Sequence, residues 1–101
     1  MARPFDEDPR VVIRVVQFTA PWCGPCKPVA KILAELEPVF RSVEFSELDV
    51  DADFEAGVRF DVLMLPTVLV FRGDEVVARL EGARRRKDYE RVLAEVVEAG
   101  E

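Results

Sequence analysis

Runs of aliphatic residues alternate with amphipathic stretches along most of the chain. The first run, Val11–Phe18, is rich in β-branched residues and predicts a mostly buried strand. After a short connection, apolar residues recur every three or four positions, as on one face of a helix. These residues are Val29, Ile32, Leu33, Leu36 and Phe40. The pattern predicts a helix that begins near Pro25 and that Pro38 ends or kinks near Glu37.

The rest of the chain predicts three more strands and two more helices. In order, they are strand Val43–Val50, helix Asp51–Phe60, strands Thr67–Phe71 and Glu75–Leu80, and helix Arg84–Ala99. Acidic residues open the first of these helices, as suits a helix N-terminus. The turn signal Arg72-Gly73-Asp74 joins the last two strands into a hairpin.

This order predicts an α/β fold. A helix between consecutive strands produces parallel pairing, and the late hairpin adds an antiparallel pair, so the sheet is mixed. The length of 101 residues predicts one domain, residues 1–101. Half of the residues are apolar and 34% are charged, which excludes the class of intrinsically disordered chains.

Charge and composition exclude further classes of function. The net charge of −6 repels phosphate and argues against binding nucleic acid. Histidine is absent, which excludes imidazole catalysis and imidazole metal ligands. The one basic run, Arg84–Lys87, predicts either a solvated helix start or a docking patch for an acidic partner.

The N-terminal residues bear on location. Met1–Arg10 is acidic, contains two prolines and lacks the apolar core of a signal peptide. The longest apolar run, Val11–Phe18, is too short to cross a bilayer. We therefore expect a cytoplasmic protein without a membrane segment.

Cys23 and Cys26 are the only cysteines. Two cysteines without histidine cannot supply the four ligands of a structural zinc site within one chain. A bridge across two residues closes so short a loop that it removes little entropy from the unfolded chain. The pair is therefore better suited to chemistry than to stability.

The two cysteines lie where a predicted strand passes into a predicted helix. The free N–H groups and the dipole at a helix start favour a thiolate over a thiol. We therefore predict that Cys23, at the mouth of the helix, is the nucleophile. Cys26, one turn in, is the predicted resolving thiol that attacks a mixed disulfide. Gly24 and Pro25 set the shape and stiffness of the turn between them.

At these residues the chain resembles the thioredoxin family. Trp22-Cys23-Gly24-Pro25-Cys26-Lys27 resembles the family's active-site signature. Leu65-Pro66-Thr67 resembles its cis-proline loop, and Gly82-Ala83 resembles the small-residue turn before its last helix.

The resemblance implies a thioredoxin-like α/β fold, with a central mixed sheet of about four strands flanked by helices. It implies a protein-disulfide reductase in which Pro66 follows a cis bond and lies against the sulfurs, and in which Leu65 offers its backbone to an extended substrate. The implied substrate-binding residues are Trp22, Gly24, Pro25, Met64, Leu65, Pro66, Gly82 and Ala83.

The implied partners are disulfide-containing proteins and a flavin- and NADPH-dependent thioredoxin reductase. The chain has no glycine-rich phosphate loop, so we expect no cofactor of its own. Three alternatives stay open: a thiol oxidase or isomerase, a binding module on the same fold, and a metal or iron–sulfur site shared between two chains.

The chain departs from the family's pattern at several positions. Gln17 stands where the family usually has a buried aspartate that relays the proton of the second cysteine, and an amide cannot act as a base. Glu47 stands where a lysine commonly pairs with that aspartate. We hypothesise that Glu47, oriented by Gln17, is the base for Cys26. The alternative is that Glu47 is solvent-exposed and water alone takes the proton.

The second departure is a shortened N-terminus. Only ten residues precede Val11, so the family's first strand and helix are shortened or missing, and Phe5 is a candidate apolar plug. Val43–Asp49 is then an exposed sheet edge, unless the N-terminal arm covers it. We expect a monomer, with weak dimerisation through this edge as the alternative.

Overall fold

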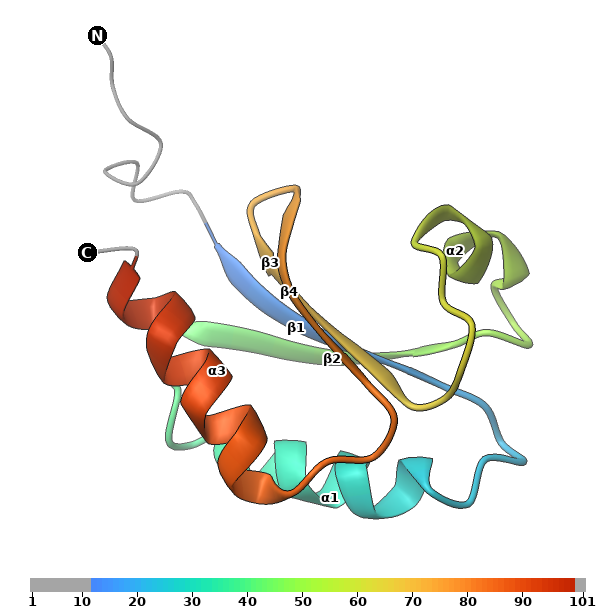
Figure 1. Cartoon of the computed structure of the whole chain (residues 1–101), viewed down its shortest axis with the longest axis horizontal. Helices are drawn as coiled ribbons and strands as arrows, with labels where there is room; N and C mark the ends of the chain where they lie inside the picture. The colour runs from blue at the N-terminus through green and yellow to red at the C-terminus, as the bar shows by residue number, and fades with distance from the viewer. Residues whose placement is uncertain (1–11, 100–101) are drawn as a thin grey trace, which may run out of the picture.

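The computed structural model describes residues 12–99, which contain every predicted element in the predicted order (Figure 1). The elements are β1 (Ile13–Thr19), α1 (Cys26–Leu36), β2 (Val43–Asp49), α2 (Phe54–Arg59), β3 (Thr67–Arg72), β4 (Glu75–Glu81) and α3 (Arg86–Ala99). As predicted, α1 ends just before Glu37 and Pro38.

Two helices begin later than their patterns predict, and side-chain caps explain both. The Asp53 carboxylate accepts the N–H of Ala56 at 3.2 Å, so α2 begins at Phe54 rather than Asp51. Ahead of α3, the Arg85 N–H donates to the Asp88 carboxylate at 3.2 Å, as in a capping box, so α3 begins at Arg86 rather than Arg84. Local capping thus overrides the composition signal at each start.

The four strands form one mixed sheet in the order β2-β1-β3-β4. Strands β1 and β2 are parallel and are joined by α1, whereas β3 runs antiparallel to both β1 and β4. Gly73 takes a φ of 62° in the tight β3–β4 turn, a conformation that glycine adopts without steric cost. The predicted mixed sheet is confirmed.

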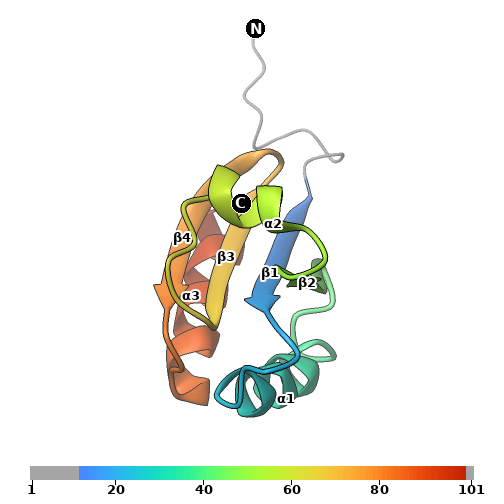
Figure 2. The same cartoon turned by 90° about the vertical axis from the view of Figure 1, so that its right-hand side faces the viewer.

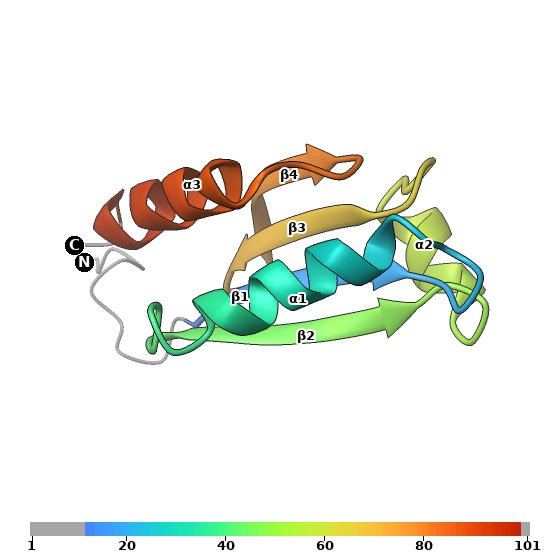
Figure 3. The same cartoon turned by 90° about the horizontal axis from the view of Figure 1, so that it is seen from below.

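Helices cover both faces of the sheet (Figures 2 and 3). Helices α1 and α3 pack on one face against Val15, Val68 and Val70, while α2 packs on the other against Phe18 and Leu69. Successive residues of a strand point to opposite faces of the sheet. A strand that is covered on both faces, such as β3, is therefore apolar at nearly every position instead of at every second one.

The edge prediction is supported in part. Within residues 12–99, β2 pairs with β1 on one side and with no strand on the other. Phe5 and the N-terminal arm lie outside the described residues, so covering of this edge and dimerisation through it stay predictions. None of the helices in residues 12–99 has the length and apolar character needed to cross a membrane.

The basic run Arg84–Lys87 spans the start of α3, and two of its members make structural contacts. The Arg86 guanidinium donates to Glu35 and Glu90, both at 2.9 Å, and so ties α3 to α1 across exposed surface. Arg84 donates to the Glu81 carbonyl at 3.1 Å. These contacts favour the solvated helix start over the docking patch.

Candidate active site

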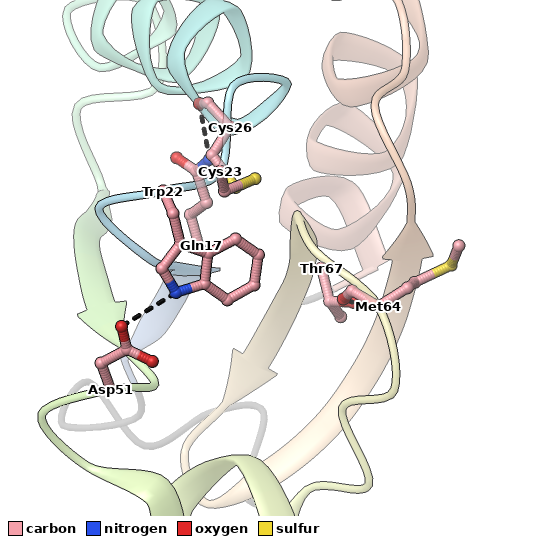
Figure 4. Close-up of a disulfide and its surroundings, with 7 residues drawn as sticks. All are labelled: Gln17, Trp22, Cys23, Cys26, Asp51, Met64 and Thr67. Carbon is pink, nitrogen blue, oxygen red and sulfur yellow. Dashed lines mark hydrogen bonds between the residues drawn. A yellow bond between two sulfur atoms is a disulfide. The ribbon is translucent and has the colours of Figure 1, made fainter.

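The two cysteines form a disulfide where β1 passes into α1 (Figure 4). Their Cα atoms are 5.4 Å apart; Cys26 is the first residue of α1, and Cys23 lies in the preceding connection. A turn in which the Cys23 N–H donates to the Ala20 carbonyl at 3.0 Å leads the chain into the helix. Both cysteines are buried, packed with Ala20 against Val50 and Leu65.

The electrostatic setting favours a thiolate at Cys23. Cys23 lies just outside the N-terminus of α1, whose first turn contains no acidic residue. Free N–H groups and the positive end of the helix dipole stabilise negative charge at that point. The structure thus provides the setting that the spacing of the motif predicted.

The loop before β3 closes the site from the other side. The Leu65–Pro66 peptide bond is cis, as predicted. The Thr67 hydroxyl donates to the Met64 carbonyl at 2.6 Å, and the Gly82 N–H donates to the Pro66 carbonyl at 2.8 Å. The first bond closes the loop on itself, and the second holds it beside the end of β4.

Gln17 is fully buried beneath the disulfide. Its Nε2 donates to the Cys26 carbonyl at 2.9 Å (Figure 4). Its Oε1 is buried and has no hydrogen-bond partner among the described residues. Gln17 therefore holds the first turn of α1, and the amide that we expected to orient Glu47 is directed to Cys26 instead.

A hollow of about 390 Å³ on the α1 side of the sheet, here called the polar cavity, reaches both cysteines. Its lining consists of Thr19, Ala20, Pro21, Cys23, Cys26, Lys27, Ala30, Glu47 and Asp49. Glu47 is exposed, and it lies opposite Gln17 in the parallel β1–β2 pair, so both point to the same face. A smaller hollow of about 110 Å³ lies between Gln17 and Glu47.

Sequence reasoning missed Asp49, which is half-buried and lines the polar cavity with Glu47. The available signal was its spacing of two residues from Glu47 in one strand, which puts both on one face. The structure therefore offers two carboxylates near Cys26 rather than one.

A larger hollow of about 490 Å³, here called the apolar groove, lies on the α2 side. Its lining consists of Trp22, Val50, Phe54, Gly57, Val58, Asp61, Val62, Leu63, Met64 and Leu65. The Trp22 Nε1 donates to Asp51 at 2.9 Å, which orients the exposed indole (Figure 4). The sequence carried no local signal for this bond, because its partners are 29 residues apart.

Some of the predicted substrate-binding residues line the apolar groove, and the others lie outside it. Trp22, Met64 and Leu65 line the apolar groove. Gly24, Pro25 and Ala83 are exposed and lie outside the linings of both hollows. Pro66 is buried and Gly82 is half-buried, joined by the hydrogen bond described above.

Comparison with known proteins decides the family. The model of the family described as Thioredoxin matches residues 6–95. The chain belongs to the thioredoxin family. A thioredoxin of Staphylococcus haemolyticus is 34% identical to it over 90 residues, which cover 88% of this chain and 86% of that protein.

Solved thioredoxins share its fold. The X-ray structure of Fasciola hepatica thioredoxin is 31% identical, with a TM-score of 0.77, covering 83% of this chain and 80% of the other. The predicted fold and chemistry are confirmed: the protein is a thiol–disulfide oxidoreductase with a redox-active pair at Cys23 and Cys26.

One relative joins two activities in a single chain. A protein of Mycobacterium leprae named bifunctional thioredoxin reductase/thioredoxin is 39% identical over 84 residues. The match covers 82% of this chain and 18% of that protein.

Proposed function

We propose that this protein reduces disulfides of partner proteins in two exchange steps. The Cys23 thiolate attacks one substrate sulfur, which forms a mixed disulfide and releases the other sulfur as a thiolate. The Cys26 thiolate then attacks the Cys23 sulfur, which forms the observed disulfide and releases the second substrate sulfur. Two electrons pass to the substrate, and each released thiolate takes up a proton.

The observation that carries this assignment of roles is the position of the pair at the start of α1. Cys23 lies outside the helix N-terminus, whereas Cys26 is inside the first turn with its carbonyl held by Gln17. The dipole thus favours charge on Cys23, while Cys26 must lose its proton before it can attack.

We further propose that Glu47 takes that proton, directly or through water. Gln17 cannot act as a base, but Glu47 and Asp49 reach the same cavity as Cys26. The smaller hollow between Gln17 and Glu47 is large enough for water, and Ser46 and Glu47 contribute polar groups to its mixed lining. Glu47 is the favoured base because it lies in register with Gln17, whereas the Asp49 carboxylate already accepts the Asp51 N–H at 2.8 Å.

The test is the pH dependence of insulin disulfide reduction by Glu47→Gln, with dithiothreitol as the electron source. We expect a rate about tenfold lower near neutral pH, because a positioned base is lost. The deficit should close above about pH 8.5, where a free thiol ionises by itself. An unchanged rate and profile would remove Glu47 from the mechanism.

Two further variants complete this experiment. Glu44→Gln is the matched control: Glu44 is also exposed on β2 but points to the opposite face, so its loss should not change the rate. Asp49→Asn tests the other carboxylate of the cavity. A larger loss in Asp49→Asn than in Glu47→Gln would assign the base to Asp49.

We propose that the substrate binds as an extended segment along Leu65, with contacts to Trp22 and Met64. Among residues 12–99, neither the N–H nor the carbonyl of Leu65 is hydrogen-bonded, so both are free to pair with a strand. Trp22 and Met64 expose apolar surface on the same groove. Gly24, Pro25, Pro66, Gly82 and Ala83 shape the adjoining surface.

For the electron donor we propose a flavin- and NADPH-dependent thioredoxin reductase, and for the location the cytoplasm. The reductase-linked relative supports this donor. NADPH oxidation in the presence of a bacterial thioredoxin reductase, insulin and this protein tests the pairing. Oxidation that does not depend on this protein would contradict it.

A further inference from the structure

The exposed apolar side chains of the protein are concentrated at one place. Eight large apolar residues are exposed among residues 12–99, and five of them line the apolar groove. The five are Trp22, Phe54, Val58, Leu63 and Met64. Scattered exposed apolar residues are ordinary, but a contiguous set around a concave surface is typical of a binding site.

Helix α2 and the loop after it extend this surface well beyond the disulfide. Phe54 and Val58 lie one turn apart on α2 and are 74% and 63% exposed, and Leu63 from the loop is 84% exposed. At the base of the groove, α2 packs close to Val50: a Cβ added at Gly57 would lie in ordinary van der Waals contact with the Val50 side chain, at 3.6 Å.

The groove is continuous with the redox site. Val50 and Leu65 line the groove and also pack against the cluster of Ala20, Cys23 and Cys26. A segment that occupies the groove is thereby placed beside the sulfur that reacts.

The surroundings of the groove are strongly acidic. Residues 50–65 contain four carboxylates, those of Asp51, Asp53, Glu55 and Asp61, against one arginine, Arg59. This stretch therefore carries a net charge of −3, half of the −6 of the chain. The nearby Arg79 guanidinium is already engaged, since it donates to the carbonyls of Phe60 and Asp61 and pairs with Glu81.

This combination identifies the kind of occupant. A second copy of the chain would bring one acidic rim against another, which is unfavourable. We propose that the groove binds an apolar segment of the disulfide-bearing partner protein that is flanked by lysine or arginine, so that the protein selects such substrates. This inference rests on the proposed function and adds the substrate class.

Binding can be measured without redox chemistry, because Trp22 is the only tryptophan and lines the groove. Two short synthetic peptides would share a Leu-Phe core without cysteine and carry either lysine or glutamate flanks. We expect the lysine peptide to bind about tenfold more tightly at about 0.02 M salt, measured by Trp22 fluorescence. The difference should shrink severalfold at about 0.5 M salt.

Two matched variants locate the binding surface. Val58→Lys puts a cation in the groove, and Val39→Lys makes the same change at a residue that is 60% exposed outside it. We expect Val58→Lys to weaken binding of the lysine peptide about tenfold and Val39→Lys to change it less than about twofold. The same ratios should appear in kcat/KM for disulfide-bonded versions of the peptides.

A small neutral disulfide, bis(2-hydroxyethyl) disulfide, separates this inference from the proposed function. The wild type and Val39→Lys should reduce it at the same rate, because Val39 lies outside the groove and this disulfide is too small to need it. Failure of the wild type to reduce it would count against the proposed reductase, while the fluorescence titration would still test the groove.

Three results would overturn the inference. The first is equal binding of the lysine and glutamate peptides at low salt. The second is equal effects of Val58→Lys and Val39→Lys. The third is a dimer of the wild type, seen by sedimentation, that Val58→Lys abolishes, because the occupant would then be a second copy.

Discussion

The polar cavity and the apolar groove adjoin the same disulfide from opposite faces of the sheet, yet they differ in chemistry. The polar cavity brings the carboxylates of Glu47 and Asp49 and the ammonium of Lys27 near the cysteines. The groove has a single charged side chain in its lining, Asp61, and is otherwise apolar except for the Trp22 ring nitrogen. The difference indicates that proton transfer and substrate recognition are separated in space.

The period of a β-strand produces this separation. Glu47 and Asp49 point from β2 toward α1, whereas Leu48 between them packs in the cluster on the α2 face. One strand thus supplies carboxylates to one side and apolar surface to the other. A change on one side should therefore leave the other side working.

The largest effect among these tests is expected for Cys26→Ser. Capture of the substrate by Cys23 should continue, but release should stop because the resolving sulfur is gone. We expect turnover of insulin to fall by about a hundredfold or more and a mixed disulfide on Cys23 to accumulate, seen by mass spectrometry. Accumulation on Cys26 in the converse variant, Cys23→Ser, would reverse the assigned order.

The second test places a charge at Gln17, which is buried beneath the disulfide on the α1 face of the sheet. Gln17→Asp puts a carboxylate into a fully buried position and removes the donor to the Cys26 carbonyl. We expect a loss of about 3 kcal/mol in the free energy of unfolding at neutral pH, measured by urea denaturation.

The pH dependence of that loss has a defined sign. Burial raises the pKa of the new carboxyl group above its unfolded value, so the folded state keeps the proton at acidic pH. The penalty should grow as pH rises through the unfolded pKa of about 3.9 and beyond, and shrink below it. Gln17→Asn is the uncharged control, and an equal loss in both variants at neutral pH would show that charge is not the cause.

The smallest expected effect lies on the apolar side. Asp51→Ala removes the acceptor that orients the Trp22 ring. Because one exposed hydrogen bond is lost, we expect about fivefold slower reduction of insulin and no change with bis(2-hydroxyethyl) disulfide. Asp74→Ala, at the exposed β3–β4 turn, removes the same charge elsewhere and should leave both rates unchanged.

Much of the fold followed from the sequence because its signals are local. The β-branched run of β1, the three- and four-residue spacing of α1 and the Gly73 turn each report on neighbouring residues. The active-site motif is equally local, and it correctly indicated the disulfide chemistry. The starts of α2 and α3 were misplaced, because the capping carboxylates of Asp53 and Asp88 compete with the composition signal.

The sequence by itself determined the elements, their order and the redox pair. Only the tertiary structure decided what surrounds that pair. The β1–β2 register put Glu47 beside Gln17, and a bond across 29 residues oriented Trp22 on Asp51. Packing of α2 against Val50 formed the apolar groove. These features depend on segments distant in the chain meeting in space, so no local pattern encodes them.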